Sequence, residues 1–172
     1  MSKSVKAIIL LVLVAYAHVN LVSLGQVNAD KREYWALVIG ISDYQYVKDL
    51  GYAHQDANDM ADALIKYNGW PESHIYKLIN SQASKQNILD HISMIDGYED
   101  SDDIFIFFFA GHGSRGPDQP PYDESDGYDE YILPYDCNGY TDTAIRDDEL
   151  QNFLDNLEST KVVILDTCYS GG

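Results

Sequence analysis

The sequence is poor in cysteine and in basic residues. Two cysteines among 172 residues are too few for a small domain held together by disulfides. Lysine and arginine together number 11 against 28 aspartates and glutamates, so the formal net charge is -17. A nucleic-acid partner is therefore not expected, because contact with phosphates requires a basic face. A basic peptide or a cation such as calcium suits this charge better.

The sequence also lacks collagen-like, coiled-coil and solenoid repeats. Its hydrophobic fraction of 45% and aromatic fraction of 12% are typical of a globular protein and exclude wholesale disorder. A length of 172 residues is enough for one domain with a short additional segment. We therefore expect a single folded domain.

The N-terminal segment has the pattern of an export signal. Two lysines precede an apolar run over residues 7–19, and small residues follow as far as Ala29. This pattern predicts a secretory signal peptide over residues 1–29, and thus a secreted or periplasmic protein whose domain comprises residues 30–172. Since apolar residues continue to Leu24, an uncleaved membrane anchor is the alternative, and it would be the protein's one route to a membrane.

Short apolar runs alternate with helical patterns along the rest of the chain. Buried strands are predicted over residues 34–41, 75–79, 104–109 and 161–165, with a short strand over residues 131–133. Helices are predicted over residues 52–67, after Ser84, and from Asp147 or Asp148. A long surface loop is predicted over residues 113–127, which are rich in Gly, Pro and Asp. This alternation indicates an α/β fold with a largely parallel sheet.

Two chemically reactive side chains follow two of the predicted buried strands. His112 comes after the strand over residues 104–109, and Cys168 comes after the strand over residues 161–165. Parallel strands bring both to one edge of the sheet, where an imidazole can take the proton of a thiol nucleophile. The main-chain N–H groups of Gly113 and Cys168 are candidates for an oxyanion hole. Taken singly, such a cysteine is also compatible with a small buried residue, and such a histidine with a loop residue.

Two aspartates are candidates for substrate binding. Asp166 lies two residues before Cys168, and Asp56 lies in the first predicted helix beside its apolar stripe. Carboxylates near the nucleophile favour a guanidinium or ammonium group on the substrate. Alternatively, Asp56 is a solvated helix residue and Asp166 accepts hydrogen bonds from loop amides.

Six segments together resemble the caspase-like cysteine peptidases of the C14 type, and metacaspases more than animal caspases. They are YWALVIGISDY, LGYAHQDANDMADAL, IFIFFFAGHGS, DGYDEYILPYD, IRDDEL and VVILDTCYSGG. The resemblance implies a three-layer caspase-like (caspase-hemoglobinase) α/β fold, mostly parallel, in which this chain is the large-subunit (p20) portion. It implies a cysteine endopeptidase in which Cys168, His112 and Gly113 have the roles given above, and acids matching Asp56 and Asp166 line a pocket for Arg or Lys. The Gln-Ala-Cys-x-Gly surround of animal caspases is absent, so cleavage after aspartate is not expected.

The acidic segment over residues 123–130 suggests calcium. It does not fit the EF-hand template, because the first and twelfth places would be Tyr122 and Leu133. Metacaspases often need calcium, and the resemblance implies a role for the pair Asp147 and Asp148, to which we add Asp126 from the acidic segment. Alternatively, Asp147 or Asp148 only caps a helix. The peptidase chemistry itself needs no cofactor, and no Cys/His cluster has zinc spacing.

The chain ends at Gly172, shortly after Cys168. Family members continue with further strands, so the resemblance implies a sheet that is incomplete at its C-terminal edge, without the small-subunit part. We therefore expect the chain alone to be poorly soluble or weakly active. Two other readings remain open here. One is an inactive scaffold or binding module with a caspase fold, or a truncated fragment that needs a partner chain. The other is a legumain-like or clostripain-like peptidase.

Overall fold

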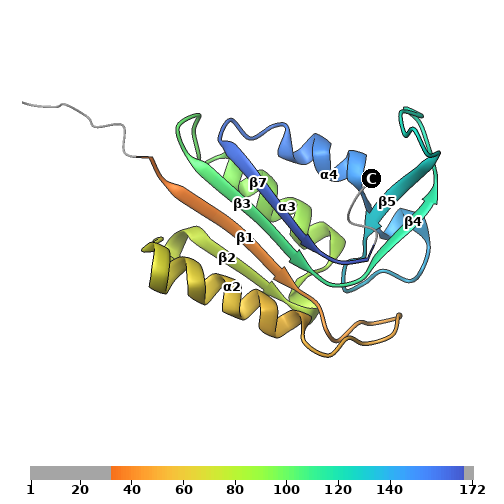
Figure 1. Ribbon diagram of the computed structural model, residues 1–172, viewed down its shortest axis with the longest axis horizontal. Helices are drawn as coiled ribbons and strands as arrows, with labels where there is room; N and C mark the ends of the chain where they lie inside the picture. Colours follow the sequence, from red (N-terminus) through yellow and green to blue (C-terminus); the bar gives the residue numbers. More distant parts are fainter. Residues whose placement is uncertain (1–31, 169–172) are drawn as a thin grey trace, which may run out of the picture. The chain divides into compact units, whose positions relative to one another are not determined.

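The computed structural model describes residues 32–168. Its main sheet has four parallel strands in the order β2-β1-β3-β7 (Figure 1). These strands are β1 (Tyr34–Gly40), β2 (Ile75–Ile79), β3 (Ile104–Ala110) and β7 (Thr160–Asp166). All four coincide closely with the predicted buried strands, which confirms the α/β prediction. The predicted signal peptide over residues 1–29 lies outside the described residues.

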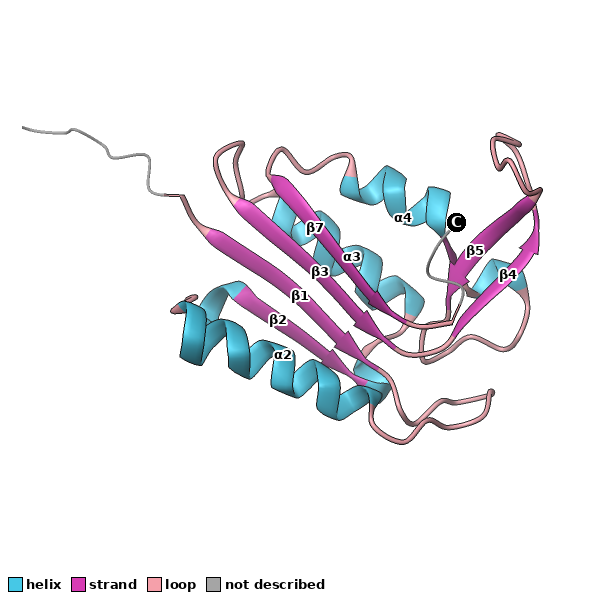
Figure 2. Ribbon diagram, viewed as in Figure 1, coloured by secondary structure: helices cyan, strands magenta, loops and turns pink. Residues whose placement is uncertain are grey.

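A second, antiparallel sheet stands beyond the carboxyl ends of the main strands (Figure 2). It contains β4 (Gly113–Pro117), β5 (Tyr128–Ile132) and β6 (Ile145–Arg146). The prediction of one long loop over residues 113–127 is therefore wrong for its first part, which pairs with β5 as a strand. The strand was not predicted because two glycines and a proline are typical of turns, although such residues are also tolerated at the edge of a sheet.

Helices cover both faces of the main sheet, which gives three layers (Figure 2). The longer helices are α2 (Ala53–Asn68), α3 (Lys85–Asp96) and α4 (Asp147–Leu154). Short 3-10 turns are η1 (Glu72–His74), η2 (Asn80–Gln82) and η3 (Thr141–Thr143). As predicted, Ser84 caps α3, because its Oγ accepts from the main-chain N–H of Asn87 at 3.3 Å. Arg146 occupies the N-cap position of α4 without a capping hydrogen bond from its side chain, and Asp147 is the first residue of the helix, with its Oδ1 accepting from the main-chain N–H of Asp148 at 2.9 Å.

The core has two halves, one on each face of the sheet. Because side chains alternate along a strand, Leu37, Phe105 and Phe107 pack on the side of α3 and α4. Val38 and Phe108 pack on the side of α2. β1 and β3 are therefore buried on both faces, which explains their continuously apolar sequences.

β7 forms one edge of the main sheet in the described part of the chain. Its middle residues Val162 and Val163 are 40% and 44% exposed, in contrast to the buried side chains of β1. The exposed apolar edge expected from the sequence is thus present among residues 32–168. None of the helices described there is sufficiently long and apolar to span a membrane.

Candidate active site

The register of the main sheet brings His112 and Cys168 to the same place. β3 and β7 pair from Ile104 opposite Thr160 to Ala110 opposite Asp166. His112 lies two residues beyond Ala110, and Cys168 lies two residues beyond Asp166. The two residues therefore follow the ends of neighbouring strands at matching positions.

Gly113 lies directly against the chain that carries Cys168. A Cβ atom at position 113 would overlap with the main-chain carbonyl oxygen of Cys168 and with Oγ1 of Thr167. Only glycine permits this close approach. Gly113 is also fixed from its other side, since it pairs with Ile132 of β5. The segments after β3 and after β7 are thus in contact, as the predicted Cys-His site requires.

Two groups from the segment after β1 hold His112. Its Nε2 lies 2.7 Å from the main-chain carbonyl oxygen of Lys48, and its main-chain N–H donates to the hydroxyl of Tyr44 at 2.7 Å. Since a carbonyl only accepts hydrogen bonds, Nε2 carries a proton and Nδ1 of the neutral ring is left to accept one. The residues alone did not reveal these partners, although Tyr44 lies in one of the segments that carry the family resemblance.

Tyr44 is an internal support of this site. Its side chain is 8% exposed, and its ring centroid lies 4.9 Å from that of His112. Burial raises the pKa of the Tyr44 phenol well above the ordinary tyrosine value, so it stays neutral. A Cβ atom at Gly111 would contact the same hydroxyl at 2.6 Å. Tyr44 therefore fixes the main chain on both sides of the peptide bond that leads to His112.

The two cysteines differ in environment. Cys168 is exposed at the strand end, whereas Cys137 is buried, and neither forms a disulfide. The hydroxyl of Thr143 donates to Sγ of Cys137 at 3.5 Å. Cys168 is therefore the thiol that is open to a substrate.

The two predicted pocket acids lie on one face of the sheet at its carboxyl edge. Asp166 points to the side of α2, because side chains alternate and Ile164 packs there. Asp56 lies in the first turn of α2, whose start packs against Gly40 at the end of β1. Both acids are exposed, and neither carboxylate has a hydrogen bond or ion pair with another residue among residues 32–168. The structure thus leaves both carboxylates open to solvent on the same side.

Acidic side chains gather where β5 faces the start of α4. Carboxylate oxygens of Asp129, Asp147 and Asp148 lie within 4.8 Å of one another, and so do those of Glu124, Glu130 and Asp147. The sequence indicates Asp147 and Asp148 individually, but it indicates the other three only as part of the acidic segment over residues 123–130, from which Asp126 was chosen. Within the run over residues 123–130, Asp129 differs from the other acids because side chains alternate along β5 and its side chain is on the buried face.

Asp129 is the most unusual member of this group. Its side chain is 1% exposed, and its Oδ2 accepts from the hydroxyl of Tyr131 and the main-chain N–H of Gln119, both at 3.1 Å. Its Oδ1 is buried and has no hydrogen-bond partner among residues 32–168. Asp126 lies in neither cluster, and its Oδ1 instead accepts from the main-chain N–H of Tyr128 at 3.0 Å. A buried carboxylate oxygen without a partner indicates that a hydrogen-bond donor or a cation is missing at that oxygen.

Several carboxylates of this acidic group have raised pKa values, because they are partly buried and lie close to one another. Burial, followed by the charge of Asp147, raises the pKa of Glu130 above its usual value. Burial, followed by the same aspartate, also raises the pKa of Glu124. Burial raises the pKa of Asp148 although Arg146 acts in the opposite direction. The described basic residues therefore do not fully balance this acidic group.

Comparison with known proteins identifies the family. The chain matches the family model of the metacaspase, peptidase C14 domain over residues 34–172. The chain belongs to the metacaspase family. Metacaspase-1 of Plasmodium falciparum is 33% identical over 172 residues, which cover 90% of this chain and 28% of that protein. Metacaspase-1 of Candida albicans is 34% identical over 149 residues, which cover 79% of this chain and 33% of that protein.

A solved structure supports the same assignment. A crystal structure of a Geobacter sulfurreducens protein superimposes with a TM-score of 0.65 and 27% identity, covering 81% of this chain and 52% of that chain. The family resemblance and the caspase-like fold class are thereby confirmed. The metacaspase domain described here spans about a third or less of the length of the curated relatives named above.

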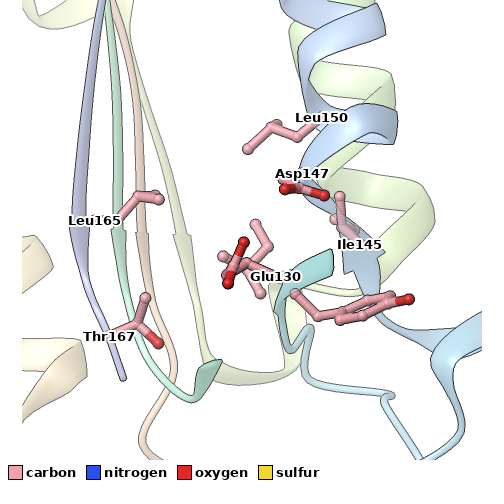
Figure 3. Close-up of a pocket in the computed structure, with 8 residues that line it drawn as sticks. Glu130, Ile145, Asp147, Leu150, Leu165 and Thr167 are labelled. Atoms are coloured by element: carbon pink, nitrogen blue, oxygen red, sulfur yellow. The ribbon is translucent and has the colours of Figure 1, made fainter. Parts of the chain in front are cut away.

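In this metacaspase domain, one pocket connects the acidic group with the end of β7. Figure 3 shows Leu165 and Thr167 on one side of the pocket and Asp147 on the other, with Glu130 between them. Leu150 completes the wall from α4. Since Thr167 precedes Cys168, the acidic group and Cys168 lie close to a common pocket.

Proposed function

We propose that this metacaspase domain is a cysteine endopeptidase that hydrolyses peptide bonds after Arg or Lys. Cys168 is the nucleophile and His112 is the proton carrier. The observation that carries this proposal is the contact of Gly113 with the main chain of Cys168, at the ends of strands in matching register. Family membership supports the same chemistry.

The arrangement supports a two-step mechanism. Nδ1 of His112 takes the proton of Cys168, and the thiolate attacks the scissile carbonyl carbon. The N–H groups of Gly113 and Cys168 stabilise the oxyanion, a contribution of about 3 kcal/mol for each well-placed donor. The C–N bond breaks, His112 protonates the leaving amine, and a thioester remains. Water, deprotonated by His112, then hydrolyses the thioester and releases the free thiol.

The proposed preference for basic residues rests on charge and placement. Asp56 and Asp166 have carboxylates that pair with no other side chain in the described part of the chain, and both lie on one face at the carboxyl edge of the sheet. A guanidinium that reaches both gains charge-assisted hydrogen bonds, whereas a substrate carboxylate is repelled.

An active-site label tests the chemistry directly. A peptide chloromethyl ketone with a terminal arginine should alkylate Cys168, as mass spectrometry of the tryptic peptides would show. Cys168→Ala should abolish labelling, and Cys137→Ala should leave it unchanged because Cys137 is buried. Labelling that persists in Cys168→Ala, or that prefers an aspartate probe, would contradict the proposal.

We also propose that the acidic group binds calcium. Asp129, Asp147 and Asp148 would hold the ion, with Glu130 beside them. The residues fit, because calcium prefers carboxylate oxygens and Oδ1 of Asp129 is buried without a partner. The bound ion would neutralise these acids and thereby bring β5 and the start of α4 together. Asp126, which serves as a local cap for Tyr128, stands outside this set.

Export through the N-terminal segment remains a proposal that the sequence pattern alone supports. Mass spectrometry of protein recovered from the medium or the periplasm should show an N-terminus at Asp30. An intact N-terminus at Met1 in the membrane fraction would favour the anchor instead.

A further inference from the structure

Arg146 reaches into the acidic group from the end of β6. Its Nη2 lies 3.1 Å from Oδ2 of Asp148, and its Nη1 lies 3.5 Å from Oδ2 of Asp129. Nη2 also donates to the main-chain carbonyl of Pro120 at 3.1 Å. The planar fork of arginine is suited to spanning two carboxylates in this way. Arg146 thus places its positive charge against two of the three carboxylates proposed to hold calcium.

The Arg146 guanidinium and a bound cation would compete for the carboxylates of Asp129 and Asp148. The side chains of Asp129, Asp148 and Arg146 are 1%, 18% and 23% exposed, so water screens their interactions only in part. A divalent cation on Asp129 and Asp148 would lie close to the guanidinium and repel it. The cation must therefore displace the arginine from these carboxylates or bind despite the repulsion.

We propose that Arg146 is an internal counter-ion that competes with calcium for Asp129 and Asp148 and thereby sets the calcium affinity of the domain. The inference rests on the calcium site proposed above. Without the ion, the guanidinium neutralises the two aspartates and holds the start of α4 against β5. When calcium binds, the guanidinium keeps only the carbonyl of Pro120. Removing the arginine charge should therefore strengthen calcium binding, although it removes two ion pairs.

Direct binding measurements on the full chain test this inference. Calcium is titrated calorimetrically, and terbium is followed by the luminescence that neighbouring tyrosines such as Tyr131 sensitise. Arg146→Gln should bind calcium about tenfold more tightly than the parent, and Arg146→Lys about threefold more tightly, because lysine keeps the charge but loses the fork. The matched control is Arg115→Gln. Arg115 lies over the ring of Tyr128 at 4.8 Å, and its charge acts on Glu130, so it reports the effect of removing a nearby positive charge.

The outcomes separate the inference from the calcium proposal itself. Affinity that rises in Arg146→Gln but changes less than about threefold in Arg115→Gln supports the competition. Affinity that is unchanged or weaker in a folded Arg146→Gln, while the parent binds calcium, overturns the role of Arg146 and leaves the calcium site standing. If Arg146→Gln does not fold, Arg146→Lys decides by the same criterion. No binding by the parent or by either Arg146 variant overturns both proposals.

Discussion

The contact between Tyr44 and His112 permits the sharpest test of how the site is held. Tyr44→Phe keeps the ring and removes only the hydroxyl, which accepts from the main-chain N–H of His112 at 2.7 Å. Because Tyr44 is buried, that N–H would lose its partner in a place with little access to water. An unsatisfied N–H of this kind costs about 1–3 kcal/mol, and a misplacement of His112 worth about 1.4 kcal/mol slows alkylation of Cys168 about tenfold.

The measurement compares Tyr44→Phe with Tyr46→Phe. Tyr46 lies on the same segment but is 62% exposed, so its hydroxyl is replaced by water at little cost. Chemical denaturation gives the change in the free energy of unfolding, and the rate of alkylation by the arginine chloromethyl ketone gives the effect on the site. If Tyr44→Phe changed unfolding by less than about 0.5 kcal/mol and left the rate unchanged, the support role assigned to Tyr44 would be wrong.

Tyr44→Phe should also change how the free energy of unfolding depends on pH in alkaline solution. The folded-state pKa of Tyr44 is raised by burial, so the folded chain keeps a proton that the unfolded chain loses above about pH 10. The stability that this group contributes is complete below that pH and declines as the pH rises. Burial also raises the pKa of Tyr131 to about 12, so it contributes to the same decline. Tyr44→Phe should therefore reduce, but not abolish, the loss of stability between pH 10 and pH 12.

Two further predictions concern the contact glycine and the pocket acids. Gly113→Ala should destabilise the domain by about 1–3 kcal/mol and abolish labelling, because its Cβ would overlap with the main chain of Cys168. Gly116→Ala, whose Cβ would meet the nearest side chain at 3.4 Å, should do neither. Asp166→Asn and Asp56→Asn should each slow labelling by the arginine probe about tenfold and leave iodoacetamide labelling unchanged. Asp59→Asn, an exposed change on α2, is the control, and an equal effect there would indicate bulk charge rather than a pocket.

The main sheet could be predicted because its signal is local. β3 is buried on both faces, so every position from Ile104 to Phe109 is apolar, and the shortness of the run and its aromatic and β-branched residues favour a strand. β4 offers no such signal. Its five residues include two glycines and a proline, and they become a strand only because β5 lies beside them. Pairing between distant segments is not encoded in the composition of either segment.

The same distinction applies to the site. His112 and Cys168 could be found because each is a reactive side chain directly after a buried strand. The partner of the His112 ring could not, because it is the main-chain carbonyl of Lys48, and any residue provides one. Asp129 was missed for a third reason. The acids of residues 123–130 look equivalent in the sequence, and only the pleat of β5 buries one of them.

One hairpin connects the two proposed centres. Asp129 of β5 lies opposite Gly116 of β4, and at the other end of the ladder Ile132 lies opposite Gly113. The main-chain N–H of Leu133 then donates to the carbonyl of His112 at 3.0 Å. A paired ladder moves as a unit, so any group that holds Asp129 against α4 also restrains the strand that presents the N–H of Gly113. The charge that balances the buried aspartate, whether a guanidinium or a metal ion, therefore bears on the geometry of the proposed oxyanion hole.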